Sequence, residues 1–409
     1  MSSRHRATGR VSGRLMQRVL VLATALLLFS FASTSHAYPW MIRHGFTKCE
    51  NCHTDPMGGE TLTAFGRVMS QEMLSTKWGN GAPSSASELF FGVAEPQELR
   101  VGGSIRVMDL DYRLPKDGKP GKNSTFPMQA DAYGQLTLFD HLKIGGSLGV
   151  SRTTGGRLEA RAAQITDGNA DGDWNAVSRT HWIGYQINDA FMVRAGRMNL
   201  PFGIRMSEHT MLVRDATHTD RESSQEYGAA LDFNKGRIRG QLMGIAGNYA
   251  VSPDDFRNRG YALYAEYMLS PHAAVGISSL VTHAKVDRYY GVPTTRIAQG
   301  LTGRWAVAEP VVILAEADLL ASDQTTTGYV GMLQADYEII QGLHLQLTGE
   351  TVNRGRLSNT TSITGQGKSQ FGGWVTLAWF FFTHFDARVD FNAEQGGQNQ
   401  ILSQVHWYF

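Results

Sequence analysis

The sequence predicts an all-β protein: an antiparallel transmembrane β-barrel of about 16 strands, preceded by a small α-helical N-terminal segment. Beyond residue 37 no apolar run is long enough for a membrane-spanning helix. From residue 98 onward, polar and apolar residues alternate with a period of two, and the connections alternate between short and long. The chain is also not hydrophobic overall, because its mean hydropathy is −0.25. A membrane protein of this composition must cross with strands.

The first 37 residues have the features of a secretory signal peptide. Five arginines precede an apolar run from Val19 to Ala32, and Ser35-His36-Ala37 places small residues at the −3 and −1 positions. We therefore expect cleavage after Ala37. A transmembrane anchor is the alternative, but the apolar run is shorter than a spanning helix needs.

Residues 38–95 contain the pattern Cys49-Glu50-Asn51-Cys52-His53, which holds the only two cysteines in 409 residues. This is the spacing of c-type haem attachment, in which two thiols bond to the porphyrin edge and the histidine ligates the iron. Cys49 and Cys52 are therefore predicted to bind one covalent haem c, with His53 as the proximal ligand. A thioredoxin-like redox pair or a disulfide is the alternative, but no βαβ pattern surrounds Cys49.

The distal side of this predicted haem site is less defined. A turn at Asp55–Gly59 precedes a predicted amphipathic helix from Glu60 to Leu74, in which Leu62, Phe65, Met69 and Met73 form one stripe. Met69 or Met73 is a candidate distal ligand, because the two lie one helical turn apart. Both could instead be packing residues on that stripe. Three further candidates near in sequence are Met41, Met57 and His44.

A segment of fewer than sixty residues covers a haem thinly. We therefore expect residues 38–95, which end in a linker at 79–87, to pack against or inside the barrel formed by residues 96–409, as a plug of its lumen. The predicted strands are 98–113, 128–139, 142–152, 178–188, 191–203, 225–234, 236–247, 259–269, 272–284, 294–307, 310–322, 326–339, 342–353, 369–381, 383–394 and 399–409.

The connections between these strands fall into two classes. Tight turns such as Asp140-His141 follow the even strands, and longer polar loops such as 115–126 and 204–226 follow most odd strands. Short periplasmic turns and long extracellular loops are typical of bacterial outer-membrane barrels, whereas a soluble β-sandwich shows no such parity. An even strand number leaves both termini on the periplasmic side. The terminal residues Trp407, Tyr408 and Phe409 are predicted to lie in the aromatic girdle that contacts outer-membrane lipid.

Charged residues occupy the polar, inward-facing positions of several predicted strands. Oxygen ligands suit Fe²⁺, so an acidic track could guide the ion inward, but a barrel lumen also needs polar residues that pair with one another. The formal net charge of +1 gives no electrostatic reason to expect nucleic acid as a partner. The inward positions are Glu316, Asp318, Asp336, Glu338, Glu350, Asp386, Asp390, Arg304 and Arg388.

The N-terminal segment resembles the fused monohaem cytochrome-porin family of the bacterial outer membrane, whose best-known members are iron oxidases. The match runs from Pro39 and Arg43 through the cysteine pattern to Phe65-Gly66-Arg67, while Val68–Gln71 departs from the aromatic and lysine residues typical of the family. The resemblance implies a lumen-held haem that takes electrons from an extracellular donor such as Fe(II) and passes them to periplasmic cytochromes.

The sequence therefore favours an outer-membrane electron conduit, with Fe(II) oxidase activity as one form of it. The haem segment is expected on the periplasmic side or in the barrel lumen. A diffusion porin for small polar or anionic solutes, with a structural or sensory haem, is an alternative. A barrel subunit of a larger multihaem conduit is another.

Overall fold

The computed structural model describes residues 38–78, 98–112, 123–152, 174–206, 208, 211–220, 224–358, 367–395 and 399–409. The predicted signal peptide and the linker at 79–87 lie outside these residues. Within them, no helix combines the length and the apolar character that crossing a membrane requires.

The described strands form a single closed sheet. β4 and β5 both pair with β3 and are separated only by residues 178–180, so they are one interrupted strand. β1 pairs with β2 on one side and with β17 on the other, which closes a barrel of sixteen antiparallel strands and confirms the predicted architecture. The strands are β1 (Leu99–Tyr112), β2 (Asn123–Leu138), β3 (Leu142–Arg152), β4 (Trp174–Val177), β5 (His181–Asn188), β6 (Phe191–Met198), β7 (Glu226–Lys235), β8 (Ile238–Gly247), β9 (Arg259–Ser270), β10 (Ala273–Ala284), β11 (Thr294–Ala308), β12 (Val311–Ser322), β13 (Thr325–Ile340), β14 (Leu343–Asn353), β15 (Gln370–Phe382), β16 (Phe385–Glu394) and β17 (Gln400–Tyr408).

Period-two alternation places polar side chains in the lumen and apolar side chains outside. In β12, Glu316 and Asp318 are buried while Leu319 is 61% exposed. His344 of β14 is likewise fully buried between outward-facing leucines. Large outward apolar side chains, which would be costly to hydrate, are the pattern expected of a surface that faces lipid.

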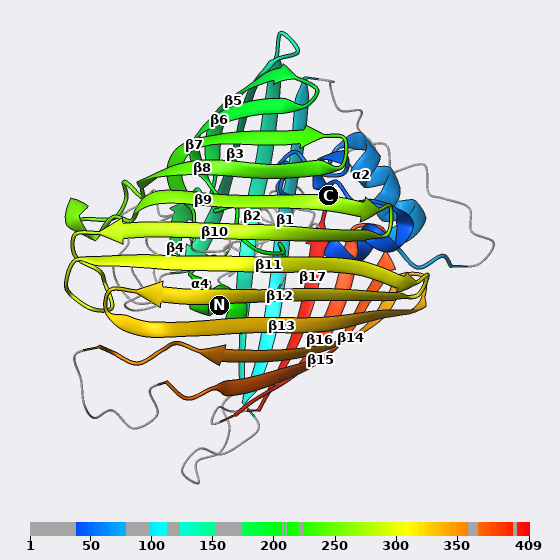
Figure 1. Cartoon of the computed structure of the whole chain (residues 1–409). Coiled ribbons are helices and arrows are strands. Elements are labelled where there is room, and N and C mark those ends of the chain that lie inside the picture. The colour runs from blue at the N-terminus through cyan, green and yellow to red at the C-terminus, as the bar shows by residue number, and fades with distance from the viewer. Residues whose placement is uncertain are drawn as a thin grey trace, which may run out of the picture.

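The two ends of the barrel differ. Seven connections of two or three residues gather at one end, which we call the short-turn end. Most connections at the other end are longer, and we call it the long-loop end. Figure 1 shows the N-terminal helices, in blue, at the same end of the barrel as the C-terminus. Arg43 of this segment donates to the Pro310 carbonyl, and the Gln341 side chain donates to the Glu72 carbonyl, so that end is the short-turn end.

The prediction of one regular helix from Glu60 to Leu74 is wrong in two ways. The helix begins only at Ala64, and residues 70–74 do not continue it with α-helical periodicity. The N-terminal segment contains η1 (Pro39–His44), η2 (Cys49–Asn51), α2 (Ala64–Met69) and a π-helical turn, η3 (Ser70–Leu74). Thr63 caps α2 by accepting a hydrogen bond from the Gly66 amide at 3.0 Å. Leu62 therefore precedes the helix, and the π-helical turn rotates the later residues away from the predicted stripe.

The prediction of a surface loop over residues 204–226 is also wrong. β6 ends at Met198 rather than at residue 203, because Pro201 cannot donate to the strand ladder and Gly203, at φ +65°, turns the chain into the lumen. The short helix α4 (Leu212–Thr217) follows inside the barrel. We call residues 199–217 the inward loop.

The inward loop and the N-terminal segment share one hydrophobic core. Burying one large aliphatic side chain in such a core stabilises a fold by roughly 1.5–3 kcal/mol. The lumen is thus filled from both ends by apolar packing. Residues of this core include Trp40, Ile42 and Leu62 of the segment and Ile204, Met211 and Val213 of the loop.

The C-terminal strand corrects one further prediction. Trp407 stacks on Phe385 with ring centroids 5.9 Å apart, but Tyr408 is 1% exposed and its hydroxyl lies 3.0 Å from the Ser70 hydroxyl. Alternation along β17 requires this, because Tyr408 shares the inward face with His406. Tyr408 therefore contacts the N-terminal segment rather than the aromatic girdle.

Candidate haem site

The cysteine pattern lines a cavity between the N-terminal segment and the barrel wall. This cavity contains about 550 Å³ of space free of protein atoms, part of which is open to solvent. Cys49, Cys52 and His53 all line it, together with Met41, Met69 and Arg304. Two thiols, an imidazole and thioethers in a largely apolar cavity are a donor set that fits a covalent haem.

A tight local turn holds the three predicted attachment residues together. The Cys49 carbonyl accepts hydrogen bonds from the Cys52 amide at 3.1 Å and from the His53 amide at 3.0 Å. The Cys52 carbonyl accepts from the Thr63 amide at 2.9 Å, which ties the turn to the start of α2. A Cβ atom at Gly66 would lie 2.2 Å from the Cys52 carbonyl oxygen, so only glycine allows α2 to approach this closely.

The structure separates the candidate distal residues. Met69 and Met41 line the cavity with His53, whereas Met73 is not among its lining residues in the described part of the chain. Met57 lines a different cavity, beside the inward loop. His44 is half-buried away from both cavities, and burial lowers the pKa of its imidazole. Of the two methionines predicted from the sequence, Met69 alone shares a cavity with the attachment residues.

Cys49 and Cys52 do not form a disulfide with each other. Burial, with a smaller contribution from Cys49, raises the pKa of the Cys52 thiol to about 12. Redox-active dithiols have depressed thiol pKa values, so this environment is unlike that of a thioredoxin-type pair. The Arg239 guanidinium of β8 donates to the Cys49 sulfur at 3.0 Å, which brings a barrel-wall cation to the first attachment residue.

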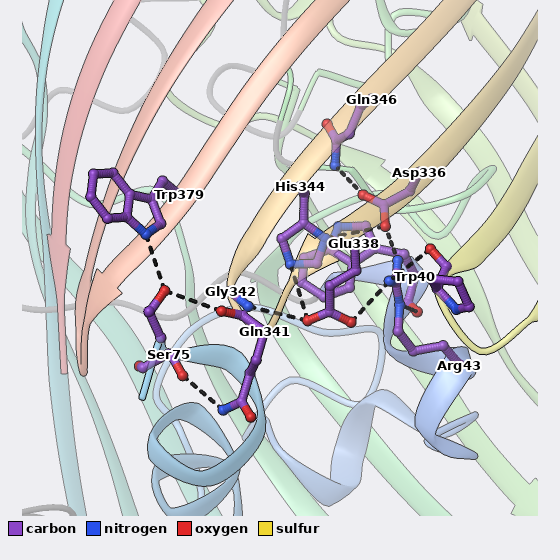
Figure 2. Close-up of polar contacts among 12 residues, drawn as sticks. Trp40, Arg43, Ser75, Asp336, Glu338, Gln341, Gly342, His344, Gln346 and Trp379 are labelled. Carbon is purple, nitrogen blue, oxygen red and sulfur yellow. Dashed lines mark hydrogen bonds and ion pairs between the residues drawn. The ribbon is translucent and has the colours of Figure 1, made fainter. Parts of the chain in front are cut away.

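One side of the segment is anchored to β13 and β14 by a buried charge cluster (Figure 2). The Arg43 guanidinium pairs with Asp336 and with Glu338, the latter at 3.0 Å. Trp40 packs against His344 with ring centroids 4.2 Å apart and the ring planes tilted by 36°. The His344 imidazole in turn contacts Asp336 at 3.2 Å. Every charge in this cluster therefore has an opposite charge or a hydrogen-bond partner.

The end of the segment is anchored at the Gln341-Gly342 turn. The Gln341 amide donates to the Ser75 carbonyl at 2.8 Å, and Thr76 donates to the Gln341 carbonyl at 3.1 Å (Figure 2). Gly342 adopts φ +83°, and a Cβ there would lie 2.7 Å from the Leu74 carbonyl oxygen. The turn thus needs glycine both for its backbone conformation and for the close approach of the segment.

The opposite side of the segment presents acids to the barrel. Asp55 pairs with Arg194 of β6 at 3.3 Å and with Arg205 of the inward loop at 2.8 Å. Burial alone would raise the pKa of Asp55, but the two guanidinium groups lower it below its usual value. Glu60 lies beside the indole nitrogen of Trp182, and burial raises its pKa.

The predicted inward charges do face the lumen, and most are paired. Arg304 pairs with Glu266, Arg214 of the inward loop pairs with Glu316, and Arg388 pairs with Asp390. Among the described residues no group of three or more His, Cys, Asp or Glu side chains is placed to hold a metal ion. The lumen charges therefore act mainly as anchors.

A larger cavity lies at the long-loop end, beyond the inward loop. It contains about 1,640 Å³ of space free of protein atoms. Its lining is mixed in charge and includes Tyr289, Tyr290 and Arg296, with the Arg296 guanidinium 4.9 Å from the Tyr289 ring centroid. We call this cavity the vestibule.

Sequence reasoning named Arg304 as an inward charge without linking it to the segment, and it missed Arg239. Arg239 lies 190 positions from Cys49, and Arg304 lies 257 positions from Thr47, so no local pattern links them. Gly66 did carry a signal, since it belongs to the Phe65-Gly66-Arg67 match.

No protein-family model matches this chain, and no curated protein sequence does. Solved structures do. OmpT, an outer membrane protein of Vibrio cholerae, aligns with a TM-score of 0.54 and 11% identity over 76% of this chain and 99% of its own.

Two other outer-membrane structures align with similar scores. The outer membrane channel DcaP of Acinetobacter baumannii aligns with a TM-score of 0.51 and 12% identity, over 76% of this chain and 97% of its own. The anion-selective porin from Comamonas acidovorans aligns with a TM-score of 0.52 and 13% identity, over 76% of this chain and 99% of its own. Identities this low establish the fold alone. That fold is a closed antiparallel β-barrel like those of outer-membrane channels and porins.

Proposed function

We propose that this protein is an outer-membrane electron conduit, which carries electrons from an extracellular donor such as Fe(II) through one covalent haem c to periplasmic cytochromes. The observation that carries the proposal is the placement of Cys49, Cys52 and His53 around one cavity inside a porin-type barrel. A c-type haem in that cavity would supply one-electron transfer without bond-making catalysis.

The residues of this chain have distinct roles in the proposal. Cys49 and Cys52 hold the haem and His53 is its proximal ligand. Met69 is favoured over Met73 as the distal ligand because only Met69 of these two lines the same cavity, which Met41 also lines. Methionine ligation would raise the reduction potential relative to a second histidine. The short turns of an outer-membrane barrel face the periplasm, so the segment anchored at that end is placed to reach a periplasmic acceptor.

The test is reduction of the haem by an external donor. Fe²⁺ added outside intact anaerobic cells should sharpen the α-band of the wild-type haem within the mixing time of the assay. His53→Ala should abolish this response, while Met73→Ala, outside the cavity, should leave it intact. Failure of external Fe²⁺ to reduce a correctly attached haem would contradict the conduit.

A diffusion porin is the second candidate, and the vestibule of about 1,640 Å³ favours it. The shared core of the inward loop and the N-terminal segment opposes free passage, because it fills the lumen below that vestibule. Liposomes containing the protein should therefore retain sugars and phosphate. Rapid leakage of either solute, with no reduction of the haem from outside, would favour the porin.

A further inference from the structure

Two arginines of the barrel wall share a single carboxylate beside the cysteine pattern. The Glu266 carboxylate of β9 accepts from the Arg239 Nε at 2.5 Å and from the Arg304 Nε and Nη2, each at 2.7 Å. Tyr264 adds a neutral hydroxyl at 3.1 Å. All three charged side chains are buried. These three residues, which we call the Arg239–Glu266–Arg304 triad, therefore carry one surplus positive charge in the lumen.

The surplus charge is directed at the N-terminal segment. Arg304 lines the cavity of the attachment residues and donates to the Thr47 carbonyl at 3.0 Å and to the Pro39 carbonyl at 3.3 Å. Arg239 donates to the Cys49 sulfur at 3.0 Å through Nη1. Among the described residues its Nη2 has no hydrogen-bond partner. A buried guanidinium with open donors is suited to a carboxylate, which it can bind in bidentate geometry.

We propose that the Arg239–Glu266–Arg304 triad is the barrel wall's part of the haem site, where its surplus positive charge binds the carboxylate edge of the haem and raises the reduction potential. This inference rests on the proposed haem function. The oxidised haem centre carries one more positive charge than the reduced centre, so a nearby cation disfavours oxidation. The low dielectric of the buried site strengthens that effect.

Charge substitutions test this inference, because removing an arginine charge and removing the Glu266 charge should shift the midpoint potential in opposite directions. Arg304→Gln and Arg239→Gln neutralise the surplus charge, so the midpoint potential should fall. Glu266→Gln increases the surplus charge, so it should rise. We expect each change to alter the ratio of reduced to oxidised haem at fixed potential about tenfold, equivalent to about 59 mV for a one-electron couple.

Two further variants separate charge from packing. Arg304→Lys keeps the charge while losing the planar fork, so its potential should remain close to that of the wild type. Arg296→Gln is a matched control, because Arg296 lies on the same strand and face eight residues away and pairs with Asp287 in the vestibule. Its potential should not change.

The titrations use purified full-length protein in detergent, after the covalent haem content of every variant has been measured. Wild-type protein without covalent haem would overturn the proposed function and this inference with it. Haem-loaded variants whose potentials match that of Arg296→Gln, or all shift in one direction, would overturn the inference about the triad alone.

Discussion

The N-terminal segment and the inward loop both fill the lumen, but the barrel holds them with different charge arrangements. The inward loop is held by neighbouring strands on one side of the barrel: Glu316 of β12 accepts from Arg214 at 2.5 Å, Glu350 of β14 accepts from the Leu212 amide at 2.8 Å, and Arg388 of β16 pairs with Glu208. The N-terminal segment is held from two sides by charges of opposite sign, since Arg43 meets acids of β13 while Asp55 meets arginines of β6 and of the inward loop.

This difference has a geometric consequence. β6 and β13 are seven strands apart in a ring of sixteen, so the two anchors lie on roughly opposite sides of the lumen. A basic anchor on one side and an acidic anchor on the other allow one orientation of the segment and penalise its reversal. The inward loop does not need oppositely charged anchors to fix its orientation, because both its ends are covalently joined to strands. Orientation matters more for the segment, which carries Cys49, Cys52 and His53.

The largest effect is expected from breaking the basic anchor. Arg43→Met leaves Asp336 buried without its cation, and loss of one partner of a buried pair costs about 3–5 kcal/mol. The segment should then be cleaved much faster by protease added to purified protein. The double variant Arg43→Met/Asp336→Leu removes both charges and should recover most of the resistance. Equal resistance of the wild type and Arg43→Met would contradict this account.

A smaller effect is expected from the anchor of the inward loop. Glu316→Gln retains a hydrogen-bonding side chain but loses the negative charge that binds both Arg214 and the Ile204 amide. A hydrogen bond to a charged group contributes about 1.5–3 kcal/mol to stability. The loop should open more often, so single-channel conductance in planar bilayers should rise while covalent haem content stays unchanged. A variant with wild-type conductance would mean that the shared hydrophobic core alone holds the loop in place.

The contrast between the barrel strands and the two segments inside the lumen also explains what the sequence could predict. Alternation with a period of two is a local property, so the strands, the inward charges of β12 and the short-turn parity could be predicted. The cysteine pattern is equally local. Which of Met69 and Met73 faces the candidate haem cavity could not be predicted, because that choice depends on a π-helical turn. The inward loop also has no periodic pattern, since its apolar residues pack on a segment 130 or more positions away.

A pH-dependent effect is expected at the short-turn end, where His384 lies in the turn between β15 and β16 and packs on Tyr408. Burial, and then Arg67, lowers the pKa of His384 to about 4. Between pH 6.5 and 4 the unfolded chain therefore binds a proton that the folded protein does not, so stability falls as the pH falls. Allowing for partial exposure of the turn, the loss is about 1–2 kcal/mol.

His384→Asn tests this prediction, because asparagine tolerates the positive φ of 70° and does not titrate. Urea unfolding in detergent at pH 7 and pH 4 should show a smaller loss of stability for the variant than for the wild type. An identical loss in both proteins would assign the acid sensitivity to the carboxylates instead.

The smallest effect is expected where the inward loop meets solvent. Arg354 pairs with Asp215 of α4 at 2.5 Å, but both side chains are about half exposed. Exposed pairs contribute about 0–1 kcal/mol, because water screens the charges and two side chains lose freedom. Arg354→Ala should therefore leave conductance and thermal stability within experimental error of the wild type. A rise in conductance as large as that of Glu316→Gln would show that the loop is held from its solvent side and not by the acids of the wall.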